Sequence, residues 1–239
     1  MPRHRIKLKS DELNETASPI PLPSGAAVQA GDRPATYYDS ERRDIAELIP
    51  ASAKRILEIG CGEGYLGQLL RSRGHYVAGF ELLPKAAEEA RKHMDEVVCG
   101  DIESDPVPWA PASFDALIFA DVLEHMVDPW RVLGKLCTLL KPGGIAVASI
   151  PNVQNYRVIR ALIGGKWEYT DSGLMDRGHV RFFTYREIVR LFDGAGLDVV
   201  DRRCLYNRKL KRRILLALTL GKIEPFFVRQ YLVVGRKRG

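Results

Sequence analysis

The sequence predicts an α/β fold built on a doubly wound, mostly parallel sheet. Two observations lead to this prediction. Short apolar segments alternate with helical segments of about ten to fifteen residues, and a glycine-rich loop joins the first strand to the helix that follows it. Such a sheet binds its ligand at the carboxyl ends of the strands, near the point where the strand order reverses. The chemistry is therefore expected at that edge.

The first half of the domain shows these elements in order. A helix over 40–48 starts at Asp39 or Ser40 as N-cap and ends at Pro50. The apolar, β-branched run 55–59 breaks at a glycine, which is typical of a buried strand. The remaining elements expected here are a helix over 65–73 that Gly74 closes, a strand over 75–80, a helix over 84–93, and strands over 97–99 and 116–120.

The second half continues the alternation. We expect a helix over 129–140 that ends at Lys141-Pro142-Gly143-Gly144, followed by a strand over 145–150. A further helix over 185–195 stops at Gly194 and Gly196, and strands over 199–205 and 228–234 complete the series. Thr184 followed by Glu187 forms the sequence of a capping box for that helix.

Composition limits the kind of protein. With 239 residues and 46% hydrophobic content, the chain can bury one sizeable core. Residues 17–34 are rich in Pro, Gly, Ser and Ala, so we expect a flexible N-terminal arm over 1–36 and a single domain over 37–239. No apolar run approaches the roughly 20 residues of a membrane span, and the chain has no Cys-x-x-Cys pair. We expect no signal peptide, because no apolar region follows the basic residues 1–10. A cytoplasmic protein without a metal site is expected.

Charge is unevenly distributed. The net charge is +6, yet residues 201–239 carry twelve Lys or Arg against two acids. Such a tail can face nucleic acid, anionic lipid, an acidic substrate or only solvent. The segment Arg208–Lys222, a basic block followed by an apolar block, can make peripheral membrane contact or pack as a helix on the sheet or on another subunit. The tail has few aromatic residues to stack bases, which disfavours nucleic acid.

The glycine-rich loop, Gly60-Cys61-Gly62-Glu63-Gly64, lies between a strand and a helix. Glycines let the backbone turn sharply and approach a ligand closely, and the following helix N-terminus attracts an anion such as a carboxylate. A dinucleotide fingerprint would require its third glycine where Tyr65 stands, so this pattern disfavours pyrophosphate binding.

Acids stand where successive strands end. Glu81 can accept hydrogen bonds from both hydroxyls of a ribose, a contact that indicates a nucleoside without saying which one. Asp101 can accept from an adenine amino group while Ile102 packs on the ring. Either acid taken alone could equally be an N-cap or a loop residue.

This ordered series of motifs resembles the class I S-adenosylmethionine-dependent methyltransferases, and most closely the ubiquinone-pathway O-methyltransferases and related enzymes of sugars and small metabolites. It comprises residues 57–64, Glu81, Gly100-Asp101-Ile102, Phe114-Asp115, Asp121-Val122-Leu123-Glu124-His125 and Leu139-Leu140-Lys141-Pro142-Gly143-Gly144. The resemblance implies a Rossmann-like sheet of seven strands whose last strand runs antiparallel. It also implies a cofactor-binding half over 54–150, an acceptor-side segment over 151–184 and a C-terminal strand pair with a basic insertion over 197–239.

The resemblance assigns S-adenosylmethionine as cofactor, S-adenosylhomocysteine as product, and a role to each matching residue. The methionine moiety would be surrounded by Glu58 and the loop residues Gly60, Cys61, Gly62 and Gly64. Glu81, with Leu82 beside it, would bind the ribose, and Asp101 with Ile102 the adenine. Asp121 and Val122 would flank the sulfonium through backbone contacts.

Residues on the acceptor side follow the fourth and fifth strands. His125 and His179 are candidates for the general base, because the histidine pKa lies near neutrality; each could instead be structural. Arg181 and Asn152 are candidates for binding the acceptor. Tyr37 and Tyr38, which precede the first helix, could form a lid over the site or simply pack.

The expected function is transfer of a methyl group to a small-molecule acceptor, on an oxygen of a sugar, a phenol or a related metabolite. The alternatives are an N-methyltransferase of a small metabolite, an NAD-dependent oxidoreductase and a polyanion-binding module. The sequence is compatible with a monomer or a homodimer.

Overall fold

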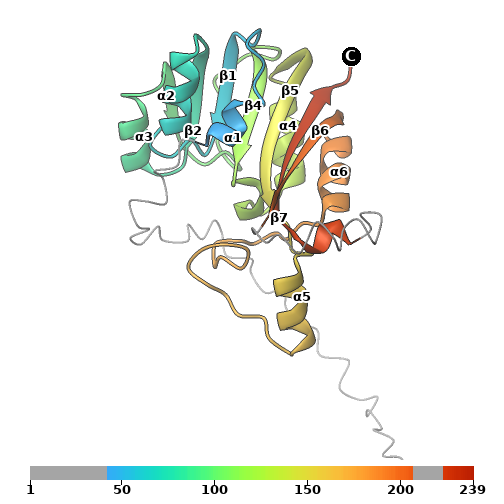
Figure 1. The fold of residues 1–239 in the computed structure, drawn as a ribbon. Helices are drawn as coiled ribbons and strands as arrows, with labels where there is room; N and C mark the ends of the chain where they lie inside the picture. The colour runs from blue at the N-terminus through green and yellow to red at the C-terminus, as the bar shows by residue number, and fades with distance from the viewer. Residues whose placement is uncertain (1–41, 207–222) are drawn as a thin grey trace, which may run out of the picture. The chain divides into compact units, whose positions relative to one another are not determined.

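A seven-stranded sheet organises the chain, with the strand order β3-β2-β1-β4-β5-β7-β6 (Figure 1). The computed structural model describes residues 42–206 and 223–239. Neighbouring strands from β3 to β5 are parallel, whereas β7 is antiparallel to both β5 and β6. The strands are β1 Arg55–Ile59, β2 Tyr76–Glu81, β3 Glu96–Cys99, β4 Phe114–Ala120, β5 Leu140–Pro151, β6 Leu197–Tyr206 and β7 Val228–Lys237. The fold class and the antiparallel last strand are confirmed.

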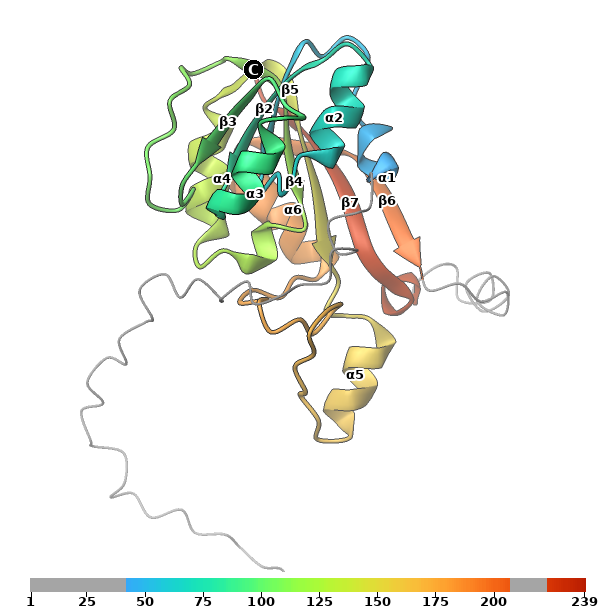
Figure 2. The same cartoon turned by 90° about the vertical axis from the view of Figure 1, so that its left-hand side faces the viewer.

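Helices cover both faces of the sheet (Figures 1 and 2). On one face lie α1, α2 and α3, and on the other lie α4 and α6, which also contact each other. The helices are α1 Arg43–Ala46, α2 Tyr65–Ser72, α3 Pro84–Ala90, α4 Pro129–Cys137, α5 Tyr156–Ile163 and α6 Tyr185–Gly194, with short 3₁₀ segments at η2 Leu123–His125 and η3 Glu224–Phe226. The doubly wound architecture follows from this two-sided cover.

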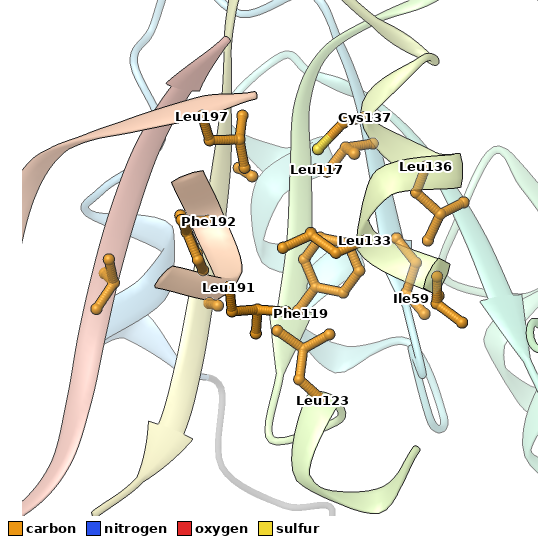
Figure 3. Packing of buried hydrophobic residues seen from close by; sticks show 14 of the residues in the cluster. Ile59, Leu117, Phe119, Leu123, Leu133, Leu136, Cys137, Leu191, Phe192 and Leu197 are labelled. Carbon is orange, nitrogen blue, oxygen red and sulfur yellow. The ribbon is translucent and has the colours of Figure 1, made fainter. Parts of the chain in front are cut away.

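The apolar core has two layers because side chains alternate along each strand. In β4, Leu117 and Phe119 point into the layer beneath α4 and α6, where Leu133 and Phe192 meet them (Figure 3). Ile118 points to the opposite layer, beneath α1 and α2. All five side chains are fully buried. Burial of each of these side chains stabilises the fold by about 1.5–3 kcal/mol. The packed core thereby holds the ends of the strands, where the site lies, in place.

The structure corrects the expected boundary between the fourth helix and the fifth strand. Helix α4 stops at Cys137, and β5 already begins at Leu140, so the segment 141–144 belongs to the strand. The β4–β5 register shifts between Phe114 and Ala116. Gly144 allows this irregular pairing, because a Cβ there would lie 3.0 Å from the Asp115 carbonyl oxygen. A Pro-Gly-Gly signal that normally ends a helix here opens a strand.

Helix α5 was not expected from the sequence, although its ends carry ordinary signals. The Asn155 side chain caps it by accepting from the Arg157 N–H at 3.1 Å, and Gly164 follows its last residue. The helix lies beyond the carboxyl end of β5 (Figure 2). It forms part of the predicted acceptor-side segment.

Some predictions concern residues outside those described: the arm over 1–36, Tyr37 and Tyr38, and the basic segment Arg208–Lys222. The described residues all fall within the compact unit Pro34–Gly239. Among them, none of the helices has the length and apolar character required to cross a bilayer.

Candidate active site

The glycine-rich loop takes backbone conformations that only glycine adopts readily. Gly60, Gly62 and Gly64 have φ angles of +66°, +55° and +84°. The Gly60 N–H donates to the Phe80 carbonyl at 2.7 Å, which holds the loop against the end of β2. A Cβ on Gly60 would lie 2.5 Å from a methyl carbon of Val122, so this glycine lets the loop touch the segment after β4. The predicted cofactor residues of two strands therefore meet here.

Glu81 ties the glycine-rich loop to the loop after β2. Its buried carboxylate accepts from the Gly62 N–H at 2.8 Å and from the Leu83 N–H at 2.9 Å. Leu82, between them, leaves half of its surface exposed, which is unusual for a leucine beside a buried strand end. A carboxylate with an apolar side chain next to it suits a ribose and its attached base.

Glu58 lies beneath the loop with almost no solvent exposure. Its Oε2 has no hydrogen-bond partner among the residues that the structure describes. Burial, and then the nearby Glu81 carboxylate, raises the pKa of Glu58 to about 8, although Arg42 acts in the opposite direction. Burial also raises the pKa of the Cys61 thiol, so this thiol is protonated near neutrality. A buried carboxyl with an unsatisfied oxygen leaves room for a cationic donor.

Asp121 follows β4 in a left-handed conformation, with a φ of +57°. Its carboxylate forms an ion pair with Arg42 and also accepts from Ser149 and Gln230. Arg42 donates further to Asp44 and, at 2.9 Å, to Ser149 Oγ. Sequence reasoning overlooked Arg42, because an arginine in a charged helix start looks like an ordinary surface residue.

Asp101 comes two residues after the end of β3. Its Oδ1 accepts from the Glu103 N–H at 2.9 Å, and its own N–H donates to Asp105, so it shapes a local turn. The adjacent Ile102 is buried. Glu81, Asp101 and Asp121 thus stand at or just beyond the carboxyl ends of three strands, as the sequence series predicts.

The acceptor-side segment is attached to η2 over a long sequence separation. The Glu124 carbonyl accepts from the N–H groups of Val180 and Arg181 at 2.9 and 3.0 Å. His125 Nδ1 lies 2.8 Å from the Gly178 carbonyl oxygen. Since a carbonyl can only accept, Nδ1 carries the proton in this contact. Gly178 is required by this packing, because a Cβ would lie 2.9 Å from His125 Nδ1.

The two predicted histidines lie together. The ring centroids of His125 and His179 are 4.8 Å apart with an interplanar angle of 67°. His179 Nε2 lies 4.0 Å from Oε1 of Glu124, which is 1% exposed and whose carboxylate oxygens have no hydrogen-bond partner in the described part of the chain. Burial, and then Asp121, raises the pKa of Glu124 well above its ordinary value.

Glu124, His125 and His179 could also hold a metal ion, although the sequence indicates none. One potential ligand atom from each residue lies within 4.8 Å of the others. Two imidazoles and a carboxylate form a familiar donor set for transition metals. The same groups can instead exchange a proton with an acceptor.

Two predicted acceptor-binding residues have structural contacts. The Arg181 guanidinium donates to the Val127 carbonyl at 2.9 Å and lies 5.6 Å from the centre of the Trp130 ring. Asn152 is fully buried, and its amide donates to the carbonyls of Pro225 and Val228 at 2.7 and 2.9 Å. The Asn152 Oδ1 accepts from the Gln154 N–H at 3.0 Å. The Asn152 side chain therefore joins β5 to the start of β7.

Comparison with known proteins agrees with this geometry. A family model described as a methyltransferase domain matches residues 31–202. The ubiquinone biosynthesis O-methyltransferase of Cereibacter sphaeroides is 31% identical over 167 residues, 67% of either chain, and that of Paracidovorax citrulli is 30% identical over 72% of this chain and 75% of that one.

Solved structures share the fold at lower identity. A possible histamine N-methyltransferase from Thermotoga maritima superposes with a TM-score of 0.59 at 22% identity, covering 84% of this chain and 89% of that chain. An S-adenosylmethionine-dependent methyltransferase from Mesorhizobium loti gives 0.59 at 17% identity, over 83% and 99%.

The chain belongs to the methyltransferase domain family, within the class I S-adenosylmethionine-dependent methyltransferases. It is an enzyme, and its cofactor is S-adenosylmethionine. The described residues fit that cofactor: the glycine-rich loop has no Cβ at its three positive-φ positions, Glu81 lies at the end of β2, and Glu58 keeps an unsatisfied buried oxygen.

Proposed function

We propose that this methyltransferase acts on an oxygen of a small-molecule acceptor such as a sugar, a phenol or a related metabolite. The relatives that are about 30% identical to this chain are named O-methyltransferases, which supports an oxygen as the methylated atom. One observation carries the proposal for this chain: the ring of His125, in the segment after β4 that also holds Asp121, meets the ring of His179 edge to face, with the ring centroids 4.8 Å apart. A hydroxyl acceptor needs such a base because its proton must leave during transfer.

The cofactor would lie across the carboxyl ends of β1, β2 and β4. Gly60, Gly62 and Gly64 would approach the methionine moiety. Glu81 would accept from the ribose hydroxyls while it keeps both backbone bonds, because each carboxylate oxygen has two lone pairs. Leu82, Asp101 and Ile102 would contact the adenine, and Asp121 with Val122 would flank the reacting centre.

Arg42 lies where it could bind the carboxylate of the methionine moiety. Its guanidinium already contacts Asp121 beside the loop and has five N–H donors in all. An anionic ligand group could share these donors with Asp44 and Asp121. Arg42 is therefore proposed as the cationic partner of that carboxylate.

The bound cofactor supplies a methyl group on a sulfonium, which an in-line displacement transfers. The protein must orient the acceptor and remove its proton. With its proton on Nδ1 against the Gly178 carbonyl, the neutral form of His125 would carry its lone pair on Nε2. This arrangement allows His125 to take the acceptor proton, and His179 with Glu124 to hold or pass it on.

The other acceptor-side residues divide into two groups. Arg181 is retained as a proposed acceptor contact, since its guanidinium has donors beyond those used on Val127. Asn152 is not retained, because its amide and its oxygen already serve the fold. Tyr37 and Tyr38 lie outside the described residues.

An acceptor screen tests the proposal. Purified protein is incubated with S-adenosylmethionine and panels of sugars, phenols and amines, and S-adenosylhomocysteine release is measured. We expect turnover with a hydroxyl compound, a loss of at least tenfold in kcat for His125→Gln or His179→Gln, and unchanged cofactor affinity in both variants. Turnover confined to amines, or full activity in both histidine variants, would overturn the proposal.

A further inference from the structure

We propose that Glu58 is protonated before the cofactor binds, and that it loses this proton when the ammonium group of the cofactor's methionine moiety takes a place beside it. Cofactor binding would then release one proton to solvent. This deepens the proposed cofactor site and rests on it.

The surroundings of the Glu58 side chain favour its protonated form. The side chain comes from the middle of the sheet and is 3% exposed, so water cannot solvate a charge there. Glu81 approaches from β2, but its two oxygens already accept backbone N–H bonds from Gly62 and Leu83. Oε2 of Glu58 has no donor at all among the described residues. Of these two neighbouring carboxyls, Glu58 is the one expected to be neutral.

The charges around Glu58 do not provide a permanent partner for its anion. Arg42 is the cation that acts on it, and its guanidinium is already paired with Asp121 and Asp44. The remaining titratable groups of the cluster are Glu81 from β2, whose carboxylate disfavours a further negative charge, and the Cys61 thiol from the loop, which is neutral and provides no positive charge. An added cation is therefore required to ionise Glu58, which agrees with a pKa of about 8 in the free protein.

The ligand can supply that cation. The amino group of an α-amino acid is protonated below pH ~7.7. Its ammonium can donate to the unsatisfied oxygen as a charge-assisted hydrogen bond. The Glu58 O–H bond breaks, its electron pair stays on the carboxylate, and the proton passes to buffer. The ligand ammonium keeps all of its protons, so the step balances.

Calorimetry in several buffers tests this release directly. Binding of S-adenosylhomocysteine is measured at pH 6.5 in buffers of different ionisation enthalpy, and the slope gives the number of protons released. We expect a value close to one, and an affinity that tightens close to tenfold from pH 6.0 to 7.0. This range keeps the ligand's own amino group protonated. 5′-Methylthioadenosine, which lacks the amino-acid moiety, is expected to bind without release.

Two variants test whether the released proton comes from Glu58. Glu58→Gln should remove the buffer dependence, whereas Glu88→Gln, on the exposed side of α3, should leave it unchanged. Should Glu58→Gln fail to fold, infrared difference spectra of the wild type provide the second measurement, with loss of a protonated carboxyl band and gain of a carboxylate band on ligand addition. Binding of S-adenosylhomocysteine with no proton release would overturn this inference and leave the proposed function intact. No binding at all would overturn the cofactor site itself.

Discussion

The guanidinium of Arg42 forms an ion pair with the carboxylate of Asp121, 79 residues further along the chain. The pair joins the start of α1 to the end of β4, beside the glycine-rich loop. Both side chains are partly shielded from water, with 18% and 31% of their surface exposed. The N-terminal helix is thereby connected to the predicted reacting centre.

Replacing Arg42 by glutamine should weaken cofactor binding by more than tenfold, because the anionic end of the methionine moiety would lose its cationic partner and Asp121 its counter-charge. Titration with S-adenosylhomocysteine measures the change. Arg91→Gln, an exposed arginine just after α3, is the control and should bind normally. Equal affinities in the two variants would remove Arg42 from the site.

Glu81→Ala should also weaken cofactor binding by more than tenfold. The substitution removes the acceptor for the ribose hydroxyls and releases the Gly62 and Leu83 N–H groups that hold the two loops together. Calorimetry gives the affinity, and the control Glu96→Gln changes a carboxylate on the neighbouring strand β3 that accepts from Tyr76. An unchanged dissociation constant would show that Glu81 does not contact the nucleoside.

Local sequence patterns predict much of the fold. The strand 55–59 matched to the residue, because a short apolar run that breaks at glycine has few other structures available. Helix α5 was overlooked although six of its eight residues are apolar; only Val158 of the helix is buried, so the helix lies outside the alternating strands and helices of the core from which the fold was predicted. The segment 141–144 was misread, because the pairing of β4 with β5 decides its structure.

The same reasoning explains what could be predicted of the site. Glu81 and Asp121 were predictable because each stands at a strand end, which sequence can locate. The contact of His125 with Gly178 spans 53 residues, so no local pattern encodes it. Arg42 depends on tertiary pairing in the same way. The sequence therefore indicates the identity of the site residues more readily than the contacts between them.

Gly178→Ala should lower kcat by at least tenfold with little effect on cofactor affinity. The new methyl group would lie 2.9 Å from His125 Nδ1 and 3.2 Å from Asp176 Oδ1, closer than normal contacts, so the His125 ring must move. Steady-state kinetics with the acceptor found by the screen, together with calorimetry, separate the two effects. Gly134→Ala in α4 is the matched control, since no atom lies within 4 Å of its added Cβ; it should retain full activity. A normal kcat for Gly178→Ala would show that the His125 position does not matter.

Glu58→Gln should change how stability depends on pH. In the folded protein the pKa of Glu58 is raised to about 8, above its ordinary value of 4.5. The native state therefore binds the Glu58 proton more tightly than the unfolded state. This tighter binding adds to the free energy of unfolding; the contribution is fully present below pH ~4.5 and is lost as pH rises through ~8. This loss is on the order of 4 kcal/mol for the wild type.

Glutamine resembles the neutral carboxyl but cannot ionise, so the Glu58→Gln variant should lose correspondingly less stability between pH 5 and pH 8. Urea unfolding at the two pH values measures the difference, with Glu88→Gln as the control. Parallel losses in wild type and Glu58→Gln would show that Glu58 is already ionised at neutral pH, and that its charge has a partner before any ligand binds.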